Sequence, residues 1–211
     1  MPENVSTRTA TTPAGIHASS VCAARVSELM SGATDAYSPD ALLFAKLIAA
    51  REVRDELPLF GIAYDRLNAL FERHFSRARP FSSANEIEPM TTKLVALKAV
   101  EHVEFVTKLR TLLLTKIGGS VHEDDAECLA TIIANACLRP DHLWRDLGLN
   151  GREDVTQMLE RYFPALVARN VDSLRWKKFL ARELALSLGL EPGPAPGCPG
   201  CEDFRHCFPR N

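Results

Sequence analysis

The most constraining feature of this sequence is the recurrence of apolar residues at helical spacing. Between residues 94 and 117 apolar residues recur at helical spacing, and they are Leu94, Leu97, Val103, Val106, Leu109, Leu113 and Ile117. Gly118 and Gly119 follow, as expected where a helix ends. No segment has the sustained alternation at every second residue that is typical of a strand, so the sequence predicts an all-α fold.

Helix start and stop signals divide the rest of the chain into further amphipathic segments. Ser38, Pro39 and Asp40 are typical of an N-cap with proline at the first helical position, and this helix is expected to continue to Pro58. Further helices are predicted around residues 67–71, 123–136, 142–144, 152–163 and 171–188. The helices before and after Gly118 are expected to form an antiparallel pair.

These segments fit a single helical domain, because 211 residues build one substantial core but hardly two. Residues 1–20 are rich in Ser, Thr, Ala and Pro, and we predict that they form a disordered lead. Residues 21–190 form the helical domain, with a connecting loop at 77–90. The segment that begins at Glu191 is rich in proline and glycine, so residues 191–211 are expected to form an irregular tail.

Charge and hydropathy exclude several classes of partner. Lysine plus arginine (25) nearly balances aspartate plus glutamate (27), and a formal charge of −2 creates no field that attracts nucleic acid. No apolar run reaches the roughly 18 residues that span a bilayer, and the lead lacks the pattern of a signal peptide. We therefore expect a cytoplasmic protein that binds neither nucleic acid nor a membrane. No nucleophile–base pair or phosphate loop is recognisable, so an enzymatic role is not expected.

The most specific motif is a group of three cysteines near the C-terminus: Cys198, Cys201 and Cys207, spaced as C-x2-C-x5-C. Such spacing lets a short loop direct several sulfur atoms toward one centre. Pro199 and Gly200 favour a tight turn, which would leave backbone amides free to face bound sulfur. We therefore predict that these thiolates hold a metal or metal–sulfur centre.

Counting the ligands separates the candidate centres. A structural zinc site is normally closed by four protein ligands, and His206 is a strained fourth ligand because it directly precedes Cys207. A cuboidal iron–sulfur cluster can be held by three thiolates with its fourth corner left open. A zinc-stabilised interaction module and a thiol oxidoreductase remain alternatives, although the latter expects a strand before the C-x2-C pair. A tail whose cysteines bind nothing is the remaining interpretation.

Three segments together resemble the NifQ family of nitrogen-fixation proteins. They are HLWRDLGL (His142 to Leu149), FPALVARNVDSLRWKKF (Phe163 to Phe179) and the terminal cysteines. The resemblance extends from about Asp124 to Pro209 and, more weakly, over residues 38–75. It leaves out the lead and the loop at 77–90.

The resemblance implies a protein that carries molybdenum on an iron–sulfur cluster and donates it for assembly of the iron–molybdenum cofactor of nitrogenase. It implies Cys198, Cys201 and Cys207 as the ligands of that cluster. It also implies three kinds of partner: the scaffold on which the cofactor is assembled, the nitrogenase iron protein, and molybdate or another molybdenum source.

The chain departs from the family pattern, C-x4-C-x2-C-x5-C, at its first cysteine, which falls on Gly193. Cys137 and His142 are the first candidates for a substitute ligand, beside His206. Cys137 continues an apolar helix face and is more simply a core residue, and His142 follows a capping aspartate and can instead bond a helix end. Cys128 is nine positions earlier and faces the opposite side of the helix from Cys137.

Several other residues lie close to the cysteines in sequence. Trp176 and Phe179 are interpreted as core residues because they share a helix face with leucines. Lys177, Lys178 and Arg182 are expected on an exposed face, where they could attract molybdate or an acidic partner surface. Phe204 and Phe208 flank the last cysteine and are expected to shield one side of the centre from water.

Overall fold

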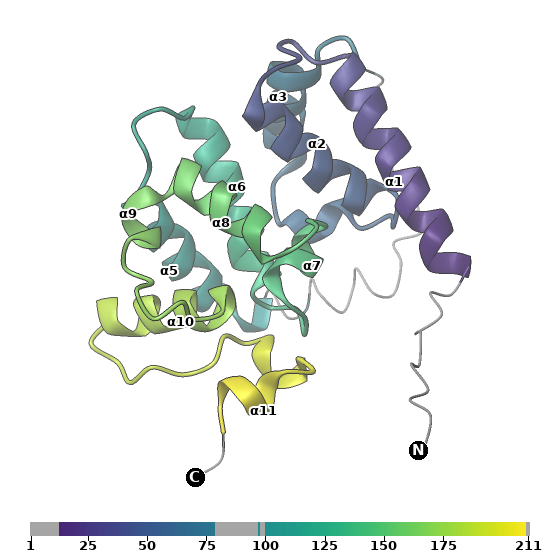
Figure 1. Cartoon of the computed structure of the whole chain (residues 1–211). Helices are drawn as coiled ribbons and strands as arrows, with labels where there is room; N and C mark the ends of the chain where they lie inside the picture. The colour runs from purple at the N-terminus through teal and green to yellow at the C-terminus, as the bar shows by residue number, and fades with distance from the viewer. Residues whose placement is uncertain (1–12, 79–96, 98–99, 210–211) are drawn as a thin grey trace, which may run out of the picture.

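The computed structural model of the protein describes residues 13–78, 97 and 100–209. Every regular element of that part is helical, so the predicted all-α fold is confirmed (Figure 1). The elements are α1 (Pro13–Ser31), α2 (Pro39–Glu52), η1 (Leu57–Phe60), α3 (Tyr64–Phe75), α5 (Val103–Leu114), α6 (Glu123–Ala136), α7 (Leu143–Leu147), α8 (Arg152–Tyr162), α9 (Pro164–Val167), α10 (Trp176–Ser187), η2 (Cys198–Gly200) and α11 (Phe204–Cys207). None of the described helices is both long and apolar enough to cross a bilayer.

The capping signal at the start of α2 acts as predicted. The side chain of Ser38 accepts a hydrogen bond from the backbone amide of Ala41 at 3.2 Å, and Pro39 opens the helix. The helix ends at Glu52, earlier than the predicted stop at Pro58, because the chain turns through Asp55 at a φ of 53°. Pro58 instead lies in the first turn of η1.

Helix α1 is described from Pro13, at a first helical position where proline favours a helix start. One further predicted helix boundary is wrong. Helix α10 begins at Trp176 and not near Val171. Its start is delayed because Ser173 has a φ of 50° and the side-chain oxygen of Asn170 accepts a hydrogen bond from the amide of Leu174.

The helix predicted over 94–117 is observed as α5 and ends at Leu114, while residues 94–96 lie outside the described part. Residues 79–90 of the predicted loop also lie outside the described part of the chain.

The core is built around α6. Helix α6 packs against α5, α3, α7 and η1, so the predicted α5–α6 pair is confirmed. Leu129 and Ile133 of α6 and Leu109 and Leu113 of α5 are fully buried. Burying a leucine or isoleucine side chain of this kind contributes about 1.5–3 kcal/mol, which makes α6 the central support of the fold.

An ion pair joins the two halves of the chain. Both carboxylate oxygens of Asp40, in the first turn of α2, accept hydrogen bonds from Arg161 of α8 at 2.5 and 2.6 Å. The hydroxyl of Tyr162 donates to the same carboxylate at 2.7 Å. Because Tyr162 is fully buried, this contact fixes the start of α2 against the core.

The C-terminal tail docks on the helical domain, beside α10 and α7 (Figure 1). Ala195 is fully buried, and the amide of Gly197 donates to the carbonyl of Cys137 at 2.9 Å. A side chain at position 197 would collide with the backbone of Arg139, so this close approach requires glycine. The tail is therefore attached to the turn that follows α6, and the cysteines are held in place.

Candidate metal centre

The three predicted cysteines line one cavity of about 260 Å³, the cysteine cavity. Cys198 comes from η2, and Cys201 and Cys207 lie at the start of the next turn and at the end of α11. Cys198 is 9% exposed, and the other two cysteines are partly buried. The remaining lining comes from three other regions: the loop and helix from Asp141 to Trp144, Arg152 at the start of α8, and Arg175 to Lys178 at the start of α10.

The wall formed by α10 is positively charged. Arg175 is the N-cap of this helix, and Trp176, Lys177 and Lys178 form its first turn. The first amides of a helix have no intrahelical acceptor, and the helix dipole adds partial positive charge at that end. Arg152 also lines the cavity, with its guanidinium 5.5 Å from the centre of the Trp176 ring. This wall is suited to an anionic group held by the cysteines.

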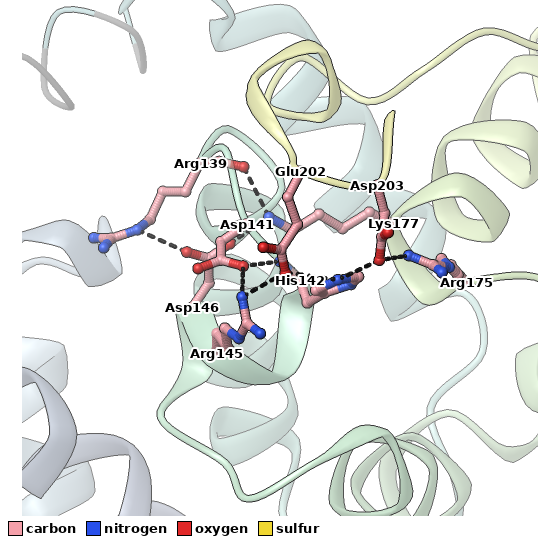
Figure 2. Close-up of polar contacts among 9 residues, drawn as sticks. All are labelled: Arg139, Asp141, His142, Arg145, Asp146, Arg175, Lys177, Glu202 and Asp203. Atoms are coloured by element: carbon pink, nitrogen blue, oxygen red, sulfur yellow. Dashed lines mark hydrogen bonds and ion pairs between the residues drawn. The ribbon is translucent and has the colours of Figure 1, made fainter. Parts of the chain in front are cut away.

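Two acidic residues between Cys201 and Cys207 clamp the tail to the domain (Figure 2). Glu202 accepts a hydrogen bond from Arg145 at 2.8 Å. Asp203 lies 3.0 Å from Nε2 of His142 and pairs with Arg175. The pairing with Arg175 holds the pKa of Asp203 below its usual range. The cysteine loop is thus held from α7 on one side and from α10 on the other.

The lysines of α10 do not form the exposed face that the sequence predicts. Lys177 is only 6% exposed; its Nζ donates to the carbonyl of Arg139 at 2.8 Å and pairs with the buried carboxylate of Asp146 (Figure 2). Lys178 donates to the carbonyl of Cys207 at 2.5 Å and lies 4.9 Å from the centre of the Phe208 ring. The prediction is wrong because the partners of Lys177 and Lys178 are distant in sequence.

Arg182, the third member of the predicted cluster, lies away from the cysteine cavity. It pairs with Asp172 at 3.1 Å and does not line the cavity. Trp176 and Phe179 are buried, as predicted, but Trp176 also lines the cavity.

The environment of the thiols follows from burial and nearby charge. Burial raises the pKa of Cys198, while a backbone hydrogen bond at Ala195 and the charge of Lys177 offset part of that increase. The charges of Cys201 and Cys207 raise it further, which indicates that the three sulfurs influence one another. Because a metal binds the thiolate, it must displace the proton of Cys198.

Arg175 interacts electrostatically with the two partly buried thiols, those of Cys201 and Cys207. Its hydrogen bond to Asp203 raises the pKa of its guanidinium, and the charges of Cys207 and Cys201 contribute in the same direction.

The candidates for a fourth ligand are separated by position. Cys137 is fully buried, burial raises its pKa to about 12, and it does not line the cysteine cavity. His206 is exposed and also lies outside the cavity lining. Gly193, where the family pattern has a cysteine, lines a different cavity, with Phe105 and Leu188. Only His142 lines the same cavity as the three cysteines.

Two details of the predicted cysteine loop need correction or refinement. The amides of Gly200 and Cys201 donate to the carbonyls of Gly197 and Cys198, so they are not free to face bound sulfur. Phe204 and Phe208 pack against each other with ring centres 5.2 Å apart, and both are partly buried against the core. The turn is stabilised by its own backbone hydrogen bonds, and the positive wall of α10 supplies the electrostatic contacts.

The spacing of possible ligand atoms distinguishes a small ion from a larger centre. In the described part of the chain, His142, Glu202 and Asp203 form the one group of three such residues whose ligand atoms all lie within 4.8 Å of one another. At least one pair of the three cysteine sulfurs therefore stands farther apart than this limit. Zinc–sulfur bonds of about 2.3 Å in a tetrahedron would bring the sulfurs to about 3.8 Å from one another.

The cysteine cavity also includes a buried donor that lacks an acceptor. Trp176 is 5% exposed, and its indole Nε1 has no hydrogen-bond partner among the described residues. Most buried donors in proteins are paired, so an unpaired indole N–H beside a cavity is unusual.

Sequence reasoning missed several residues of the site. Arg152, Arg175 and Trp144 were assigned no role, and neither were Glu202 and Asp203. The position of Glu202 and Asp203 inside the C-x5-C spacing was the available signal, because charged residues there must lie close to the ligands.

Comparison with known proteins agrees with the resemblance that the sequence motifs indicate. A family model described as NifQ matches residues 22–209, including the region 77–90 that the motif resemblance omitted. Protein NifQ of Azotobacter vinelandii is 40% identical over 129 residues, which are 60% of this chain and 62% of that protein. The Protein NifQ homolog of Sinorhizobium fredii is 43% identical over 101 residues, or 47% of this chain and 43% of that protein.

Protein NifQ of Rhodobacter capsulatus is 34% identical over 100 residues, covering 47% of this chain and 54% of that protein. The alignments thus span less than two thirds of the length of each of these relatives. No solved structure matches the chain.

Proposed function

The chain belongs to the NifQ family, and from this premise we propose that it is an iron–sulfur protein that carries molybdenum for assembly of the nitrogenase iron–molybdenum cofactor. Membership of the family indicates a role in nitrogen fixation. The finer assignment rests on the cysteine cavity and on the chemistry of the residues that line it.

The observation that carries the proposal is that Cys198, Cys201 and Cys207 line one cavity opposite a cationic helix start. An iron–sulfur cluster bound by thiolates is anionic, and charge and hydrogen bonding around it set its potential and lifetime. Arg175 and Lys178 compensate such charge, together with the N-terminus of α10. A cavity with this lining supports an inorganic anion better than a neutral ligand.

The residues present also fit a cluster better than a single zinc ion. At least one pair of cysteine sulfurs stands farther apart than a tetrahedral zinc site requires, and a centre of several irons can bridge a longer distance. The unpaired indole N–H of Trp176 is a suitable donor to sulfide. When bound, the cluster would supply the sulfides and the metal corner at which molybdenum is exchanged.

Exposure of the thiols supports a role as a carrier. Cys201 and Cys207 are partly exposed, whereas Cys198 is nearly buried. A centre held on one side and open on the other can exchange metal with a second protein without being released into solution. We propose that the acceptor is the cofactor-assembly scaffold or the nitrogenase iron protein, that molybdate or another source supplies the metal, and that the chain itself performs no catalysis.

Metal and sulfide analysis of anaerobically purified protein tests this function. We expect iron and acid-labile sulfide in the wild-type chain, and a loss of most of both in Cys198→Ala and Cys201→Ser. Cys22→Ser is the matched control, because Cys22 is a partly buried thiol that lines a different cavity. Iron-loaded protein should then take up molybdenum and transfer it to an apo acceptor.

The alternatives predict different results in the same samples. Stoichiometric zinc without visible absorbance would support the zinc-stabilised module. Turnover of a disulfide substrate would support a thiol oxidoreductase. Absence of both iron and sulfide from properly reconstituted wild-type protein would refute the proposed function.

A further inference from the structure

The cysteine cavity offers three thiols, and a cuboidal cluster has four corners. The family's remaining cysteine position is Gly193, which lines a separate cavity. A substitute ligand must reach the cysteine cavity from elsewhere in the fold. His142 is the histidine on its lining, whereas His206 is exposed and Cys137 is enclosed in the core.

The ring of His142 is held in position by an aromatic neighbour and two carboxylates, the more distant of which is that of Glu202, 3.8 Å from Nε2. It stacks on Trp144 at a centroid distance of 6.3 Å and an interplanar angle of 13°. Its Nε2 lies 3.0 Å from the carboxylate of Asp203. His142 is also the N-cap of α7, so its backbone is fixed by the start of that helix.

The contact with Asp203 is of the kind that prepares a histidine to bind metal. Metal-bound histidines usually donate their second ring N–H to a carboxylate, which fixes the tautomer and the ring orientation. With Nε2 engaged by Asp203, the nitrogen left for a metal is Nδ1, for which no partner is present in the described part of the chain. Asp203 also lies between Cys201 and Cys207, so the residue that orients His142 belongs to the cysteine loop itself.

We propose that His142 is the fourth protein ligand of the cluster, in place of the cysteine that the family pattern has at position 193. The assignment rests on the proposed function and adds a chemical consequence to it. Imidazole is a neutral ligand, and replacing thiolate by histidine raises the reduction potential of an iron–sulfur centre. The corner held by His142 would be the one most easily exchanged, its iron leaving as molybdenum enters.

Pulsed electron paramagnetic resonance of the reduced, iron-loaded protein tests the ligand directly. Protein labelled with ¹⁵N-histidine should show a nitrogen coupling to the cluster, and His142→Ala should abolish it. His206→Ala is the matched control because His206 lies one residue from Cys207 yet outside the cavity, and it should leave the coupling unchanged.

Iron content provides a second readout. We expect His142→Ala to lose about one iron per chain, with sulfide largely retained, because three thiolates still hold the rest of the centre. His142→Cys should restore the iron and lower the reduction potential relative to the wild-type protein. If His142→Ala does not fold, the potential shift and the lost nitrogen coupling in His142→Cys still decide the assignment.

The outcomes separate the ligand assignment from the function. Iron and sulfide in wild-type protein without any histidine coupling would overturn the assignment of His142 and leave the carrier function intact. The assignment also fails if Gly193→Cys, and not His142→Cys, lowers the potential. Wild-type protein that holds neither iron nor sulfide would overturn both.

Discussion

The ammonium of Lys177 donates a hydrogen bond to the backbone carbonyl of Arg139, with Nζ and O 2.8 Å apart. That carbonyl lies against Gly197, and Arg139 itself bonds the carboxylate of Asp146 at 3.0 Å. The carbonyl of Arg139 therefore connects α10, the turn after α6 and the docked tail. Substitutions of the residues that contact it should affect both the stability of the domain and the attachment of the tail.

Lys177→Met should destabilise the protein by about 1.5–3 kcal/mol, because it removes one of the two cations that pair with the buried carboxylate of Asp146 and leaves Arg139 as the other. Urea denaturation measures the loss of unfolding free energy. Lys178→Met is the control: its Nζ bonds a single carbonyl of the tail, so we expect a loss of about 1 kcal/mol. Equal losses in the two variants would mean that the buried pair has no special role.

Gly197→Ala should release the tail while leaving the helices intact, because the added methyl group collides with the backbone of Arg139. We expect this collision to weaken docking of the tail by about 1–3 kcal/mol. A protease should then cleave the tail of the variant on the order of tenfold faster than that of the wild-type chain. Circular dichroism should be unchanged. Gly193→Ala, where an added Cβ meets nothing within 4 Å, should be cleaved at the wild-type rate.

Asp40→Asn should weaken the link between α2 and α8 by about 2–3 kcal/mol at neutral pH. Burial alone raises the pKa of Asp40, but hydrogen bonds from Arg161 and Tyr162 outweigh it and hold the pKa below its usual range. The stabilisation is therefore complete above the unfolded pKa of about 3.9 and is lost as the pH falls through the folded value.

Denaturation between neutral pH and about pH 2 measures this dependence. The wild-type chain should lose stability on the acid side more steeply than Asp40→Asn. Parallel curves for the two proteins would show that Asp40 is not the titrating group.

Arg175→Gln should lower the reduction potential of the iron-loaded protein by about 50 mV, nearly a tenfold change in the one-electron equilibrium. The substitution removes a cation that interacts with Cys201 and Cys207 and leaves the charge of Asp203 uncompensated. Arg182→Gln removes the same charge from the same helix at a position that pairs with Asp172, and it should shift the potential little. Protein-film voltammetry distinguishes the two.

Local sequence rules predicted the parts of the fold that depend on neighbouring residues. The cap at Ser38 and the buried face of α6 follow from spacing alone, whereas in the apolar row of α5 Leu109 and Leu113 are buried and Val103 is exposed. The three cysteines were found for the same reason, since a short loop determines their proximity.

Features that depend on distant contacts could not be predicted in this way. Lys177 lies in a helix turn with two other charged residues, a pattern typical of an exposed face, but its partner Asp146 is 31 positions away. The late start of α10 depends partly on Arg152, which bonds the carbonyls of Ser173 and Leu174 from another helix. The cationic lining of the cysteine cavity arises from such contacts, because Arg152 and Arg175 are brought beside the cysteines only by the tertiary fold.

The separate location of Gly193 bears on how related genes are sorted. A survey that counts cysteines against a fixed pattern would discard this chain as an inactive copy. A survey that asks instead whether a histidine before the short helix α7 and an aspartate between the last two cysteines occur together would retain it. Sequences that lack the first cysteine but keep this His–Asp combination would then form a distinct lineage, open to comparison in strains that depend on them.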